Sequence, residues 1–139
     1  MQCVSDTIQE NIGFQSQFNC KIGECLTKIV VHRFTNKCMV LITQYSGLPN
    51  LYLIQFDAKD EHEKRIAPLN ITEFHTSVPV TMKCLLGVDQ AEARAGIQFL
   101  INRTKLSKCP TDILIALGLR KVDGQVLNQI ADILDKNLY

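Results

Sequence analysis

The sequence predicts an α+β domain, in which an antiparallel sheet of about six strands carries two helices on one face and buries its other face in a dimer. Short apolar runs typical of strands fill the chain before residue 88. Helical patterns begin only after that point, and one further apolar run, 113–119, separates them. The 139 residues suffice for one real core, so we expect a single domain over 1–139.

The first four strands are predicted in the opening part of the chain. Turn-forming residues separate four apolar runs, which are 14–22, 26–34, 37–45 and 51–56. The first run alternates apolar and polar side chains, as expected for a strand with one wet face. A meander is the simplest arrangement of four strands joined by short turns.

A charged segment and a fifth strand come next. Residues 57–65 carry charges of both signs and only one apolar side chain, which indicates an exposed loop. The fifth strand is predicted over 77–86. Pro79 needs an edge, a strand start or a bulge there, because proline cannot donate a ladder hydrogen bond.

The turn at residues 87–89 and the end of the chain predict the helices. Gly87 suits a positive φ, and Asp89 with Glu92 forms a capping-box pattern that would start a helix over about 90–105. The turn lacks the glycine spacing of phosphate-binding loops, so we expect no anion site there. Asp123 should cap the final helix, whose apolar stripe is Val126, Leu127, Ile130, Ile133 and Leu134.

Composition and charge argue against several classes of function. The 15 basic and 14 acidic residues nearly balance, so nucleic acid is not an expected partner. No apolar run reaches the ~18 residues of a membrane span, so no membrane partner is expected either. The N-terminus lacks the pattern of a secretory signal. We therefore expect a cytoplasmic protein, with the nucleus as a second compartment.

The cysteines and histidines form no recognisable catalytic or metal-binding pattern. A reducing compartment would keep the six cysteines as thiols, and their spacing lacks the paired ligands of a zinc site. Three scattered histidines mark no base for a thiol nucleophile. We expect a protein that is not an enzyme, with no catalytic residues, no cofactor and no metal. A thiol-dependent enzyme is a third alternative that alkylation of accessible cysteines would test.

The central strands predict dimerisation because consecutive residues in them are apolar. Two helices ~10 Å wide cover about four strands on one face only, so the opposite face requires a second sheet. In the run 113–119, Ala116 and Gly118 are small enough for a helix to approach closely. We therefore expect the other face of this strand to form the dimer interface, through Ile113, Ile115, Leu117 and Leu119.

The segments MVLITQYSGLPNLYLI and VPVTMKCLLGVDQ are followed by ILIALGL and an amphipathic terminal helix. Together these segments resemble the proteasome assembly chaperone 3 family and, more loosely, the fourth chaperone. The residues that carry the resemblance are Thr43, Gln44, Tyr45, Gly47, Leu85, Leu86, Gly87 and Asp89. The resemblance implies a small α+β protein that forms homodimers or pairs with the fourth chaperone. It also implies that the protein binds proteasome alpha-type subunits, helps to order their ring and then leaves.

Two hypotheses follow for the mode of action. A chaperone of this kind needs no active site, since it favours one arrangement of subunits by differential binding. The charged loop would help to engage an alpha-type subunit through Lys59, Asp60, Glu61, Lys64 and Arg65.

The alternative is a longin- or roadblock-like dimerisation module in trafficking or signalling, in which a helix precedes or interrupts the early strands.

Overall fold

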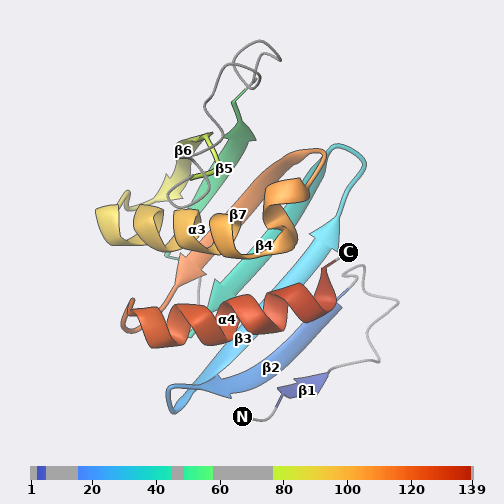
Figure 1. Cartoon of the computed structure of the whole chain (residues 1–139). Helices are drawn as coiled ribbons and strands as arrows, with labels where there is room; N and C mark the ends of the chain where they lie inside the picture. The colour runs from blue at the N-terminus through green and yellow to red at the C-terminus, as the bar shows by residue number, and fades with distance from the viewer. Residues whose placement is uncertain (1–2, 6–15, 45–48, 58–76, 139) are drawn as a thin grey trace, which may run out of the picture.

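The computed structural model describes residues 3–5, 16–44, 49–57 and 77–138. Within these ranges, seven strands form one sheet, and helices α3 and α4 lie on one of its faces (Figure 1). The strands are β1 (Cys3–Ser5), β2 (Ser16–Ile22), β3 (Cys25–Arg33), β4 (Lys37–Thr43), β5 (Asn50–Phe56), β6 (Val80–Gly87) and β7 (Asp112–Gly118). The helices are α3 (Ala91–Arg103), the short 3₁₀ helix η2 (Lys105–Lys108) and α4 (Gly124–Asn137).

The predicted α+β class, with a mostly antiparallel sheet and two helices on one face, is confirmed, but the predicted meander is wrong at its fourth strand. The order across the sheet is β1-β2-β3-β4-β7-β5-β6, so β7 lies between β4 and β5. β7 pairs in parallel with β4, and every other neighbouring pair is antiparallel. A continuously apolar strand is most stable in the middle of a sheet, which explains why the late strand displaces β5 from β4.

The six predicted strands are present with small shifts at their ends. β1 is an additional strand that the sequence pattern did not predict. Pro79 lies just before β6, the edge strand, where its carbonyl accepts a hydrogen bond from the Asp57 amide at 3.1 Å. At this position the missing N–H of Pro79 removes no hydrogen bond from the sheet.

The hydrophobic core lies between the sheet and the two helices. Alternate residues of β4, β5 and β7 are buried toward the helices, as period-two strands require. Direct register pairs such as Val40 with Ile115, and Ile115 with Tyr52, place these side chains in rows. α4 contributes Leu127, Ile130, Ile133 and Leu134 from its predicted stripe, and Asp123 caps it by accepting the Val126 amide at 3.0 Å.

The close approach of helix to sheet is made by a glycine of α3 rather than by small residues of β7. A Cβ added at Gly96 would lie 2.8 Å from Cδ2 of Leu117. Leu117 therefore points toward α3, whereas Ala116 points away from the helices. The prediction that Ala116 and Gly118 face the helices is therefore wrong.

This reversal corrects the predicted dimer-interface set. Ile113, Ile115, Leu117 and Leu119 belong to the core under the helices, and their exposed fractions in the single chain are 0%, 0%, 3% and 7%. The helices already cover them, so they are not the surface that the chain offers to a second copy. The local pattern could not show this, because both faces of β7 are apolar.

Candidate interaction face

The face of the sheet opposite the helices carries the candidate functional site. We call it the open sheet face and define it by Val30, Met39, Leu41, Leu51, Leu53, Leu114 and Ala116. Strand alternation places these side chains opposite the core residues of β3, β4, β5 and β7. No helix in the described part of the chain covers this face (Figure 1).

Register pairing arranges the open sheet face in continuous rows. One row runs from Met39 through Leu114 to Leu53, across β4, β7 and β5. A second row joins Val30, Leu41 and Ala116 across β3, β4 and β7. Val30 and Ala116 are buried by their neighbours, while the leucines and Met39 remain only half-buried. The centre of the sheet thus presents an apolar surface that its own chain leaves partly wet.

Exposed leucines extend this surface toward both edges. Leu26 on β3 is 71% exposed, and Leu86 on β6, which pairs with Leu51, is 64% exposed. Lysines at Lys28 and Lys83 occupy outward positions of the same two strands and are exposed. An apolar centre with a charged rim is the composition of protein–protein interfaces.

Buried polar side chains hold the strands beneath this face in place. Asn50, which is 2% exposed, pairs with both backbone groups of Leu117 at 3.2 and 3.3 Å, so it ties β5 to β7. The Gln44 amide nitrogen donates to the Thr27 hydroxyl at 3.0 Å, and its oxygen accepts the Arg120 amide at 2.9 Å. Gln44 therefore links β3 to the connection between β7 and α4.

The predicted capping box is absent from the turn between β6 and α3. A network of hydrogen bonds to Asp89 takes its place. The N-cap of α3 is Gln90, which makes no side-chain capping bond. Asp89 instead accepts two hydrogen bonds from Arg94, at 2.7 and 2.8 Å, and one from the hydroxyl of buried Tyr52 at 3.0 Å. The bonds from Arg94, followed by the bond from Tyr52, hold the pKa of Asp89 below its usual value.

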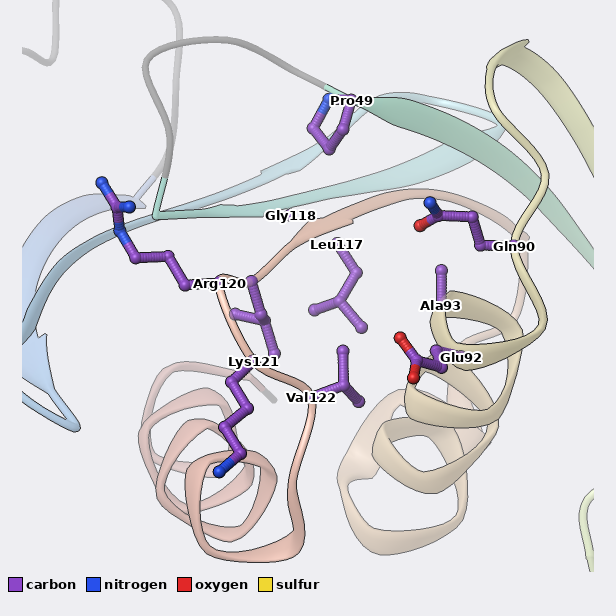
Figure 2. A pocket seen from close by; sticks show the side chains of 10 residues that line it. Pro49, Gln90, Glu92, Ala93, Leu117, Gly118, Arg120, Lys121 and Val122 are labelled. Carbon is purple, nitrogen blue, oxygen red and sulfur yellow. The ribbon is translucent and has the colours of Figure 1, made fainter.

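A hollow of about 530 Å³ lies between the start of α3 and the β7–α4 connection. Figure 2 shows Leu117 and Val122 in its centre, while Arg120 and Lys121 extend away from Leu117. Glu92 also lines the hollow, so its charges are of both signs and do not converge on one point. This arrangement offers no defined position for a charged ligand.

The charged loop and the histidines are the remaining candidate residues that the sequence offered. Lys59, Asp60, Glu61, Lys64 and Arg65 lie outside the described residues. His32 packs edge-on against Phe34 at the end of β3, with ring centres 4.5 Å apart. Within the described ranges, no group of three or more His, Cys, Asp or Glu side chains could hold a metal ion. Over those same residues, no helix has the length and apolar content needed to span a membrane.

A sheet with one helix-covered face and one open apolar face places this domain in the α+β class. A sequence model of the family described as proteasome assembly chaperone 3 matches residues 40–137, which is more than half of the chain. The chain belongs to this family. The match includes Gln44, Asn50 and Asp89, whose structural roles are described above.

A solved structure supports the same fold. The chain is similar to a protein in the structure titled "Crystal Structure of a Novel Chaperone Complex for Yeast 20S Proteasome Assembly", with a TM-score of 0.51. The similarity covers 98% of each chain at 11% sequence identity, so it shows a shared fold. No curated protein matches the sequence.

Proposed function

We propose that this protein is a non-catalytic assembly chaperone that dimerises through the open sheet face and binds proteasome alpha-type subunits to promote ordered formation of the alpha ring. Its family membership supports a role in proteasome assembly. The partner across the open sheet face is a second copy of the chain or the related fourth assembly chaperone. The site of action is the cytoplasm, with the nucleus as a second compartment.

The observation that carries this proposal is the apolar character of the open sheet face. Met39, Leu114 and Leu53 lie side by side across three adjacent strands and are half-buried in the single chain. A continuous apolar surface of this kind marks a protein–protein contact site more often than scattered apolar side chains do. A second sheet packed ~10 Å away would bury these rows and leave the helices on the outside of the dimer.

Alpha-type subunits must bind at a surface that stays accessible when the chain dimerises. The predicted charged loop at residues 57–65 supplies charged groups of both signs for this contact, through Lys59, Asp60, Glu61, Lys64 and Arg65. Mixed charges suit a chaperone that must leave, because exposed ion pairs contribute only ~0–1 kcal/mol each and are screened by salt. Family membership favours this function over the longin- or roadblock-like alternative.

The experiment is affinity capture of purified alpha-type subunits by the tagged chain in three forms. The wild type should retain one or more alpha-type subunits. A variant in which the five loop charges are neutralised should retain much less subunit while still dimerising. Gln129→Lys, which adds a charge to the exposed side of α4, should behave as the wild type and serves as the control.

The outcomes separate the parts of the proposal. If the wild type captures no alpha-type subunit, the chaperone function proposed here is contradicted. If the loop variant captures subunits as well as the wild type does, the loop is not the contact and only that assignment fails.

A further inference from the structure

Two cysteines that are far apart in the sequence meet at the start of the parallel strand pair. Cys38 is the second residue of β4 and is buried, with 2% of its surface exposed. Cys109 follows η2, three positions before the start of β7, and is half-buried. The register of β4 with β7 pairs Lys37 with Asp112 and Cys38 with Ile113, so both strands start at the same edge. Both cysteines line the same small cavity, so their side chains lie near each other.

A small cavity gives access to this pair. It has a volume of about 160 Å³, and both cysteines line it together with Arg33, Lys105 and Lys108. A water molecule occupies about 30 Å³ of liquid, so the cavity can admit a molecule as small as hydrogen peroxide. Its three charged lining residues are cationic, which favours an anionic thiolate over a neutral thiol.

The surroundings shift the pKa values of the two thiols in opposite directions. The hydrogen bond from Cys38, followed by the contact with the Thr111 hydroxyl at 3.5 Å and the charge of Arg33, lowers the pKa of Cys109 to about 5. The same thiol–thiol hydrogen bond and burial raise the pKa of Cys38. Asp57 and Asp112 line the neighbouring hollow on the other side of Cys109 and are the nearby acidic groups. Cys109 is the more accessible of the two thiols and lies among cationic side chains, whereas Cys38 is buried, so Cys109 is the thiol that ionises more readily.

We propose that Cys109 and Cys38 form an oxidant-sensitive pair, in which hydrogen peroxide oxidises Cys109 and Cys38 then closes an intramolecular disulfide. In the first step the Cys109 thiolate attacks one peroxide oxygen, the O–O bond breaks, and a sulfenic acid and hydroxide form; the hydroxide takes up a proton to become water. In the second step the Cys38 sulfur attacks the Cys109 sulfur, the S–O bond breaks, and a second water leaves with the proton of Cys38. Two thiols and one peroxide thus yield one disulfide and two waters.

The disulfide would join β4 covalently to the connection between η2 and β7. It would lie at the edge of the helix-covered side of the sheet, where Leu106 and Leu138 close the same cavity. The open sheet face is on the other side of β4. Oxidation would consequently cross-link two parts of the core and leave the proposed dimer surface unchanged. The cysteine pair is therefore independent of the chaperone function.

Peroxide treatment of the full-length protein followed by tryptic mapping without reduction tests the proposal. Cleavage after Lys37 and Lys108 releases Cys38 and Cys109 in separate peptides that each contain one cysteine. We expect these two peptides to appear linked, with the loss of two hydrogen atoms. Cys25 and Cys84 are also half-buried and serve as internal controls, which should remain largely unlinked at the same peroxide dose.

Two further measurements keep the test decisive if a variant folds poorly. In Cys38→Ser, peroxide should leave a sulfenic acid on Cys109 that dimedone traps. In the untreated wild type, alkylation of Cys109 by iodoacetamide should change little between pH 8 and pH 6, whereas an ordinary thiol slows by close to a hundredfold. Linkage of other cysteine pairs in place of this one, or a Cys109 alkylation rate that falls as for an ordinary thiol, would overturn the proposal.

Discussion

Gly87 occupies a backbone position that no other residue fits. Its φ is +82°, and a Cβ added there would lie 2.1 Å from the carbonyl oxygen of Pro49 and 2.8 Å from Cα of Asn50. Both contacts are with backbone atoms, which cannot rotate away as a side chain can. The glycine therefore lets the end of β6 pass directly against the start of β5.

Gly87→Ala should destabilise the protein by about 2 kcal/mol or more, since left-handed strain and a backbone clash act together. Urea unfolding at a fixed protein concentration measures this loss. The matched control is Gly124→Ala, because a Cβ at Gly124 meets nothing within 4 Å. That control should stay within about 1 kcal/mol of the wild type, on the stabilising side. Equal effects of the two substitutions would show that the turn is not constrained as described.

Asp89 makes stability depend on pH in a definite direction. Arg94, and to a smaller extent Tyr52, lowers the pKa of Asp89 in the folded protein. Asp89 therefore adds to the free energy of unfolding at pH values above its unfolded pKa of about 3.9. The contribution is lost as pH falls through the lower, folded pKa. The stability difference between the wild type and Asp89→Asn should therefore be larger at pH 6 than at pH 3. Urea unfolding at the two pH values measures it.

The Arg94→Gln background provides the control for this pH effect. Arg94 donates both strong hydrogen bonds to Asp89, so Asp89→Asn should change the pH dependence much less when Arg94 is absent. An unchanged pH effect in that background would mean that another group is responsible. The sequence could predict the glycine of this turn but not the partners of Asp89, because those partners depend on the burial of Tyr52, 37 positions away.

At the scale of elements, Gln44 connects parts of the chain that no local pattern relates. Its side chain bonds to Thr27 on β3, to the Ile22 carbonyl at the end of β2, and to the Arg120 amide after β7. Gln44 is 8% exposed, so these groups would lie unpaired in a buried place without it. The residue thus fastens three strands together just beyond the end of β4.

Gln44→Ala should cost about 1–3 kcal/mol of unfolding free energy, because it leaves buried donors and acceptors unsatisfied. Gln129→Ala removes the same side chain from the exposed side of α4 and should stay within about 0.5 kcal/mol of the wild type. Thermal or urea unfolding of both variants provides the comparison. A Gln44→Ala protein as stable as the control would refute the bridging role.

The strands were predictable one by one, while their order was not. Apolar periodicity located β2 to β7 within a few residues, since each strand buries at least one face. The insertion of β7 between β4 and β5 depends on a parallel pairing of residues more than 70 positions apart, which leaves no local signal. The same long-range pairing brings Cys38 to Cys109, and the cysteine spacing gave no indication of that contact.

For the whole molecule, the prediction of an apolar face that the helices leave uncovered agrees with the structure. The residues of β7 predicted to form this face were the wrong ones, because the helices cover them. Both faces of this strand are apolar, so the side that the helices cover is decided elsewhere, at Gly96, where α3 can approach Leu117. Leu114 and Ala116 are left on the open sheet face. The proposed partner sheet would therefore pack on Leu114 and Ala116 and not on the odd-numbered residues of β7.

Sedimentation of the purified chain at micromolar concentration, for the wild type and for Leu114→Lys, tests whether the open sheet face mediates dimerisation. The proposal predicts a species with twice the 15.7 kDa of one chain for the wild type. Leu114→Lys places a charge in the middle of the open sheet face and should shift the protein to single copies, whereas Gln129→Lys should leave the dimer intact. A wild-type chain that sediments as a single, well-behaved copy and is unaffected by Leu114→Lys would contradict the account.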